Sequence, residues 1–164
     1  MNRHPEDFMS GFKIAYVEAG WHANILASGK EAFVHRMQSK GIEESRIHCF
    51  TVPGAFEIPL FARRLAASGR YTAIAGAALV VDGGIYRHDF VASTVVDALM
   101  RVQLDANVPV FSMVLTPHHF HEHSTHQQFF KDHFSVKGSE LADACMQQLM
   151  NLEALDTYRA DTLT

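Results

Sequence analysis

Four short apolar runs, each closed by a turn signal, divide this chain into repeating units. Residues 12–19, 47–52, 73–81 and 110–115 are rich in aliphatic and aromatic side chains, and Gly, Pro or polar residues follow each run. Runs of this length predict β-strands. The third is apolar enough to be buried on both faces, as central parallel strands are.

The segments between these runs predict helices. Helical patterns cover residues 24–40 and about 138–155, residues 55–60 lead into a helix that ends near Gly69, and another helix begins after Asp89. In that last segment the apolar residues recur at the spacing of a core-facing helix, namely Val91, Val95, Ala98, Leu99 and Val102. Four alternations of strand and helix predict an α/β protein, a three-layer α/β/α sandwich with a four-stranded parallel sheet and helices on both faces.

The length and composition indicate one globular domain. The chain has 164 residues, 48% of them hydrophobic and 20% charged, so it can bury a sizeable core. We expect a single domain over residues 12–156, a flexible N-terminal tail over 1–11 and a C-terminal tail over 157–164. The two cysteines, Cys49 and Cys145, lie too far apart in sequence to suggest a disulfide framework, which favours a reducing compartment.

Charge and hydropathy exclude two classes of partner. A net charge of −4 gives no electrostatic footprint for nucleic acid. No apolar run reaches membrane-spanning length, and no signal-peptide core begins the chain. We therefore expect a cytoplasmic protein that binds neither nucleic acid nor membrane.

Candidate chemistry gathers where the third predicted strand ends. Gly83 and Gly84 follow that strand, and Arg87, His88 and Asp89 come just before a helix. Backbone N–H groups at a helix start attract anions, and glycines allow an anion to approach closely. The pattern therefore suggests an anion-handling site, with an ordinary strand-to-helix turn as the alternative.

Two further side chains follow the first and second predicted strands. Trp21 is the only tryptophan; it would either fill the core or stack on a ligand. Glu57 stands in the first turn of a predicted helix, where it would compensate the helix dipole or accept hydrogen bonds from hydroxyl groups of a ligand. The carboxyl ends of parallel strands meet at one edge, so both are candidates for the same crevice.

A histidine-rich segment follows the fourth predicted strand. Six histidines lie within sixteen residues: His118, His119, His121, His123, His126 and His133. The segment has no H-E-x-x-H zinc signature, so we favour solvated or interface histidines, or donors to an anionic substrate, over a metal site. Phosphate-loop, dinucleotide and α/β-hydrolase motifs are also missing from the sequence.

Three motifs together resemble the lumazine synthase family. They are V-P-G-A-F-E-I-P over 52–59, G-G-x-x-x-H-D-F-V over 83–91, and V-P-V with L-T over 108–116. The resemblance runs from about residue 12 to 152, and the histidine-rich segment is similar to that of a decameric bacterial type. It implies a flavodoxin-like fold and the condensation of 5-amino-6-(D-ribitylamino)uracil with 3,4-dihydroxy-2-butanone 4-phosphate, with no metal or other cofactor.

The resemblance also implies an assembly and a set of site residues. It implies a homo-oligomer, a pentamer or a dimer of pentamers, with small-molecule substrates bound at the subunit interface. The positions implied for the ribitylaminouracil are Trp21, Ala55, Phe56, Glu57, Leu79, Val80, Val81 and Ser112. Those implied for the phosphate are Gly84, Ile85, His126 and Lys137.

Two departures from the family pattern affect the chemistry. When the chain is aligned with the family pattern without a gap, Arg87 falls at the position of the family's catalytic histidine. An arginine is a poor base because its guanidinium stays charged near neutral pH. We therefore expect His88 to carry the proton and Arg87 to meet phosphate or transition-state charge, unless the helix turns His88 away. His126 stands where the family has an arginine, which predicts weaker binding of the butanone phosphate. These departures leave a low-turnover flavin- or lumazine-binding scaffold, or a histidine-rich structural shell, as alternatives.

Overall fold

The computed structural model describes residues 8–83, 85, 87–117 and 124–162. Strands and helices alternate as predicted, and two short 3₁₀ turns, η1 and η2, stand before β2 and α3. The elements are β1 (Ile14–Ala19), α2 (Ala23–Ser39), η1 (Glu44–Arg46), β2 (Ile47–Val52), η2 (Ala55–Glu57), α3 (Ile58–Ala67), β3 (Ala73–Leu79), α4 (His88–Ala106), β4 (Val110–Leu115) and α5 (Ser124–Thr162).

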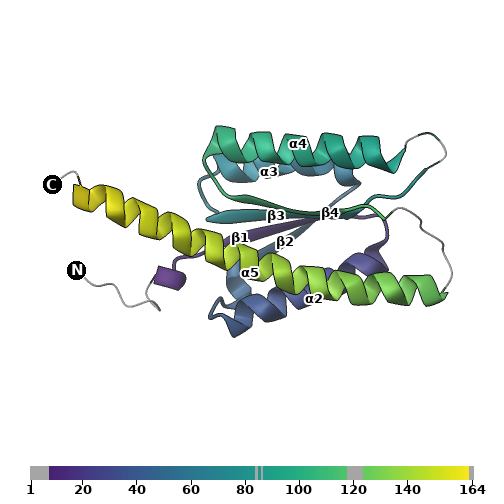
Figure 1. Ribbon diagram of the computed structural model, residues 1–164, viewed down its shortest axis with the longest axis horizontal. Coiled ribbons are helices and arrows are strands. Elements are labelled where there is room, and N and C mark those ends of the chain that lie inside the picture. Colours follow the sequence, from purple (N-terminus) through teal and green to yellow (C-terminus); the bar gives the residue numbers. More distant parts are fainter. Residues whose placement is uncertain (1–7, 84, 86, 118–123, 163–164) are drawn as a thin grey trace.

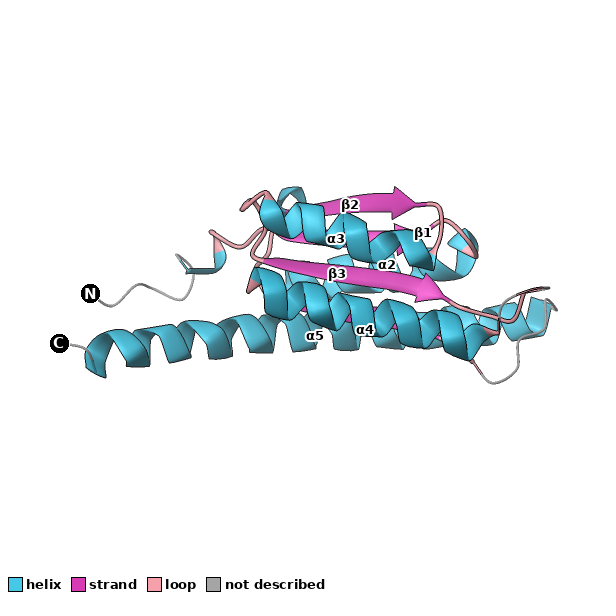
Figure 2. Cartoon of the chain, turned by 90° about the horizontal axis from the view of Figure 1, so that it is seen from above, coloured by secondary structure: helices cyan, strands magenta, loops and turns pink. Residues whose placement is uncertain are grey.

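The four strands form one parallel sheet in the order β2-β1-β3-β4. Helices α3 and α4 cover one face, and α2 and α5 cover the other (Figure 1). The view from above shows β1, β2 and β3 pointing the same way (Figure 2), and β4 pairs parallel with β3. The predicted three-layer, flavodoxin-like α/β/α sandwich is therefore confirmed.

The central strands β1 and β3 are buried along their whole length. In β3 the small residues let helices approach the sheet: a Cβ added at Gly76 would lie 3.0 Å from Ile58 Cγ2 and 3.4 Å from Leu99 Cδ1. One charged side chain is buried among the described residues. It is Glu18 of β1, whose carboxylate accepts a hydrogen bond from Lys30 Nζ at 2.9 Å. This bond raises the pKa of Lys30 above its ordinary value.

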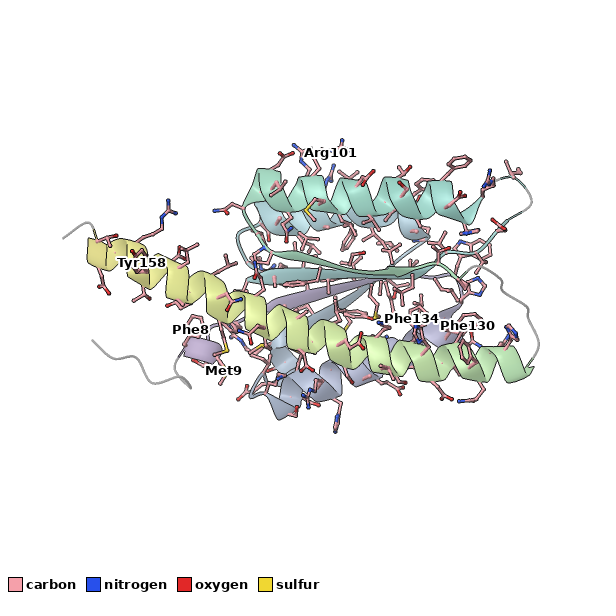
Figure 3. All side chains as sticks on the ribbon, in the orientation of Figure 1. Phe8, Met9, Arg101, Phe130, Phe134 and Tyr158 are labelled. Carbon is pink, nitrogen blue, oxygen red and sulfur yellow. The ribbon has the colours of Figure 1, made fainter. Side chains whose placement is uncertain are left out.

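Helix α5 is much longer than the sequence pattern predicted. It has 39 residues and begins at Ser124, although the pattern placed its start near Gly138 and assigned residues 157–162 to a tail. No proline interrupts the segment, and Gly138 is held inside the helix by packing rather than ending it. The last turns are exposed and project beyond the sheet, with Tyr158 on the projecting part (Figure 3).

The N-terminal end of the described chain packs on the body. Residues 8 and 9 belong to a helical turn, and the Phe8 ring meets the Phe12 ring edge-on, with the ring centroids 4.5 Å apart.

Although α5 is long, no helix within the described residues has an apolar stretch sufficient to cross a membrane.

Helices α2 and α5 run in the same direction and cross at two glycines. Asn24 bonds to Gln127 near their first turns, and Arg36 pairs with Asp143 farther along. At the crossing, a Cβ on Gly138 would lie only 2.2 Å from the carbonyl oxygen of Gly29. The backbones therefore touch, and a side chain at Gly138 has no space.

We expect Gly138→Ala to destabilise the protein. Alanine favours a helix over glycine by about 1 kcal/mol, but the two backbones would have to separate, and overpacking of this kind costs roughly 1–3 kcal/mol or more. Chemical denaturation should show a net loss of stability. The neighbouring Ser139→Ala is the matched control and should change little; a Gly138→Ala variant as stable as the control would contradict the close packing.

Candidate active site

The loops after all four strands meet at the carboxyl edge of the sheet. Gly20 N–H donates to the Val52 carbonyl at 2.8 Å, which joins the ends of β1 and β2. Val80 N–H donates to the Leu115 carbonyl at 2.8 Å, and Thr116 Oγ1 donates to the Val80 carbonyl at 2.7 Å. In a sheet of this kind, ligands bind beyond this edge.

Trp21 does not fill the core. It is 71% exposed in the loop between β1 and α2. The next residue, His22, has a left-handed backbone with φ 58°, and its carbonyl accepts from the N–H groups of Ile25 and Leu26. A non-glycine residue in this conformation is uncommon and often marks a functional loop. No signal in the sequence identified it.

Trp21 and Glu57 lie on the same small patch above Gly54. A Cβ placed on Gly54 would be 3.1 Å from Glu57 Oε2 and 3.6–3.7 Å from Trp21 Cδ1 and Nε1. Glu57 ends η2, and its carboxylate is exposed and makes no hydrogen bond within the described part of the chain. The two side chains therefore lie close together, and a ligand crevice shared by them stays a prediction. Ala55 and Phe56 belong to the same turn, with Phe56 half exposed.

The end of β3 offers its free backbone groups at Val81 rather than at Val80. Both backbone groups of Val80 are already bonded within the sheet edge, as described above. Val81 follows the last strand residue, Leu79, and its N–H and carbonyl have no backbone partner among the described residues. Leu79 and Val80 are buried. This strand end therefore presents, at Val81, a donor and an acceptor that no backbone group of the described residues engages.

The described residues between Val81 and α4, which are 82, 83, 85 and 87, are exposed. Gly84 lies outside the described residues, and Ile85 is exposed. Arg87 directs its guanidinium to Asp89, with Nη2 at 3.2 Å from Oδ2, and over the Phe90 ring at 5.1 Å. His88, the first residue of α4, turns its ring back toward the loop instead, where Nδ1 lies 2.8 Å from Asp82 Oδ1.

The carboxylate of Asp82 is a part of the site that the sequence did not single out. The backbone N–H of His88, and after it the His88 ring, hold the pKa of this carboxyl below its ordinary value. Asp82 and His88 are six residues apart. The one signal for Asp82 in the sequence is that an acidic residue follows a predicted strand. Its bond to His88 could not be predicted, because it depends on how the loop folds.

Two of the predicted site residues, Ser112 and Lys137, lie apart from this patch within one chain, whereas His126 is next to Gln127, which bonds to Asn24. Ser112 is exposed in the edge strand β4, where its Oγ accepts from Val114 N–H at 3.3 Å. Lys137 pairs with Glu140 at 2.8 Å on α5, thirteen residues beyond Ser124, which is about 20 Å along a helix. His126 lies in the first turn of α5, with its ring 5.8 Å from that of Phe130.

The histidine-rich segment is described only in part. His118, His119, His121 and His123 lie outside the described residues, whereas the ring of His133 stacks on Phe129 with centroids 6.3 Å apart. Within the described ranges, no three His, Cys, Asp or Glu side chains are grouped closely enough to hold a metal ion.

Known proteins match nearly the whole chain. The sequence profile of the 6,7-dimethyl-8-ribityllumazine synthase family matches residues 11–153. A 6,7-dimethyl-8-ribityllumazine synthase from Rhodococcus erythropolis is 55% identical over 149 residues, covering 91% of this chain and 96% of that protein. Two proteins named 6,7-dimethyl-8-ribityllumazine synthase 2 are also similar. The one from Pseudomonas syringae pv. tomato is 56% identical and covers 87% of this chain and 84% of its own length. The one from Bradyrhizobium diazoefficiens is 50% identical, with coverages of 93% and 90%. The chain therefore belongs to the 6,7-dimethyl-8-ribityllumazine synthase family.

Proposed function

We propose that this chain is the enzyme that condenses 5-amino-6-(D-ribitylamino)uracil with 3,4-dihydroxy-2-butanone 4-phosphate. The products are 6,7-dimethyl-8-ribityllumazine, a precursor of riboflavin, with phosphate and two molecules of water. Family membership across residues 11–153 carries this conclusion. We place the reaction in the cytoplasm and assign it to a single domain over residues 12–156.

The patch above Gly54 supports a binding site for the ribitylaminouracil. An exposed indole at Trp21 supplies a flat apolar surface on which a pyrimidine ring stacks. The turn Ala55–Glu57 presents the Phe56 ring and the free Glu57 carboxylate beside it, and an ionised carboxylate accepts strong hydrogen bonds from hydroxyl groups of a ribityl chain. The free backbone groups of Val81, next to Leu79 and Val80, suit the polar edge of the pyrimidine.

The loop before α4 supports a phosphate site. Backbone amides near Gly84 and Ile85 precede the N-terminus of α4, where the helix dipole favours an anion. In our proposal His126 and Lys137 add side-chain donors to the same phosphate. Neither of them belongs to the loop of Ile85, so we assign them to a site completed by a neighbouring copy.

The chemistry requires positioning and proton transfer. The amine of the uracil attacks the butanone ketone, water leaves to form a Schiff base, phosphate is eliminated, and ring closure with loss of a second water gives the lumazine. Holding two substrates together removes much of the entropic barrier, and one group that gives and takes protons assists the rest. We assign that group to His88, because Arg87 is engaged by Asp89 and Phe90 and cannot act as a base. Arg87 then supplies positive charge for phosphate or the transition state.

An enzyme-dependent rise in lumazine absorbance is the direct test of this function. We expect the protein to form lumazine from both substrates faster than the spontaneous reaction does, because the site holds both of them. The control omits the butanone phosphate. The departures at Arg87 and His126 leave one alternative, a low-turnover flavin- or lumazine-binding scaffold. Tight flavin binding without accelerated product formation would support the scaffold and contradict the enzyme.

We further propose that the active site is shared between subunits of a pentamer or a dimer of pentamers. Ser112 lies exposed on edge strand β4, away from the Trp21 patch, which suits a residue that serves a neighbouring copy. Helix α4 also exposes apolar side chains that an assembly would cover, namely Phe90, Val96, Met100 and Leu104.

Light scattering should give the mass of five or ten chains, and a monomer would contradict the shared site. Leu104→Glu places a charge in the proposed contact of α4 and should lower the mass, since burying an unpaired charge is unfavourable. Gln147→Glu, on the exposed side of α5, is the matched control and should keep the mass of the unaltered protein.

A gain-of-charge variant tests the phosphate assignment of His126. We expect His126→Arg to lower KM for the butanone phosphate about tenfold, because a charge-assisted, bidentate hydrogen bond is worth roughly 1.5–3 kcal/mol. His133→Arg, seven residues farther along α5, is the control and should leave KM near its original value. An unchanged or higher KM in His126→Arg would exclude a phosphate contact at this position.

A further inference from the structure

The carboxylate of Asp82 bonds to His88 twice through one oxygen. Oδ1 accepts the backbone N–H of His88 at 2.8 Å and lies 2.8 Å from ring atom Nδ1. The His88 side chain is 22% exposed, whereas that of Asp82 is largely open to solvent. The loop after β3 therefore fixes the histidine by both its backbone and its ring.

This arrangement determines which ring nitrogen carries the hydrogen. The two bonds to His88 hold the pKa of Asp82 below its ordinary value, so the carboxylate is ionised near neutral pH and only accepts hydrogen bonds. Nδ1 must then be the donor. In the neutral ring this leaves a lone pair on Nε2, which makes Nε2 the atom that accepts a proton.

We propose that Asp82 is a positioning residue for the condensation, and that Asp82 and His88 act as one proton-carrying pair. The carboxylate sets the ring orientation and tautomer, and it stabilises the imidazolium that forms when Nε2 takes a proton. This logic is that of a carboxylate behind a catalytic histidine. The proposal rests on the proposed function.

The proton transfers balance within the condensation. As the amine attacks the ketone, Nε2 takes a proton from the nitrogen and returns it to the former ketone oxygen. A second transfer by the same route lets that oxygen leave as water and gives the Schiff base. Asp82 stays ionised throughout, and no other co-reactant is needed.

A structural role for Asp82 must be separated from this catalytic one. His88 is the first residue of α4, and its N–H has no partner within the helix. Asp82 satisfies that N–H, so its removal would loosen the helix start even in a protein where the ring of His88 did nothing. A cap alone, however, does not require the second bond to Nδ1.

A double-mutant cycle separates the two roles. Asp82→Ala is expected to lower kcat at least tenfold, less than the roughly 10²–10⁴-fold typical of general acid–base groups, because Asp82 acts through His88. KM for either substrate should change less than about twofold. In a His88→Ala background, Asp82→Ala should change kcat less than about twofold, since the pair is already broken.

Two further variants complete the cycle. Asp82→Asn keeps an oxygen that accepts both N–H groups but loses the charge, so it should recover part of kcat. Asp156→Ala, an exposed aspartate on α5, is the matched control and should keep the full rate. A kcat unchanged in Asp82→Ala, or equal losses with and without His88, would overturn the proposal.

A readout that does not depend on turnover keeps the two proposals distinguishable. Magic-angle-spinning ¹⁵N NMR of histidine-labelled protein, with the His88 signal identified by its loss in His88→Gln, should show the Nδ1–H tautomer. An Nε2–H tautomer in the unaltered protein would overturn the pairing. Unaltered protein that makes no lumazine would reject the proposed function and the catalytic role with it. Lumazine formed at the full rate by Asp82→Ala would reject the role of Asp82 alone.

Discussion

The parallel pairing of the four strands is the constraint on which the candidate site depends. Because β2, β1, β3 and β4 all run the same way, the loops that follow them open at one edge. The indole of Trp21, the carboxylate of Glu57 and the pair formed by Asp82 and His88 come from three different loops at this edge. An antiparallel arrangement of the same segments would have separated them.

The sequence predicted the sheet well because its strands are short, apolar and sharply ended. The start of helix α5 was not predicted by the local sequence pattern. Gly138 looked like a helix boundary, since glycine is a poor helix former, yet it lies inside α5 where the backbones of α2 and α5 touch at Gly29. Tertiary packing overrides local preference there, and a pattern read along one segment does not contain the partner helix.

In the candidate site, too, some contacts follow from the order of strands and loops in the sequence and others do not. Trp21 and Glu57 could be placed together from the sequence because each follows a strand end. The bond between Asp82 and His88 could not, since it depends on the course of a loop that places two residues six positions apart against each other. Ser112 and Lys137 belong to elements remote from the patch within one chain, so no reading of a single chain brings them to it.

A crystal structure with a ribitylated pyrimidine analogue and phosphate bound tests this account most directly. We expect the pyrimidine stacked on Trp21, the ribityl hydroxyl groups at Glu57, phosphate at the loop before α4, and Nε2 of His88 facing the bound molecules with Asp82 behind it. An analogue bound away from Trp21, or Arg87 facing the reacting atoms with His88 turned outward, would contradict it.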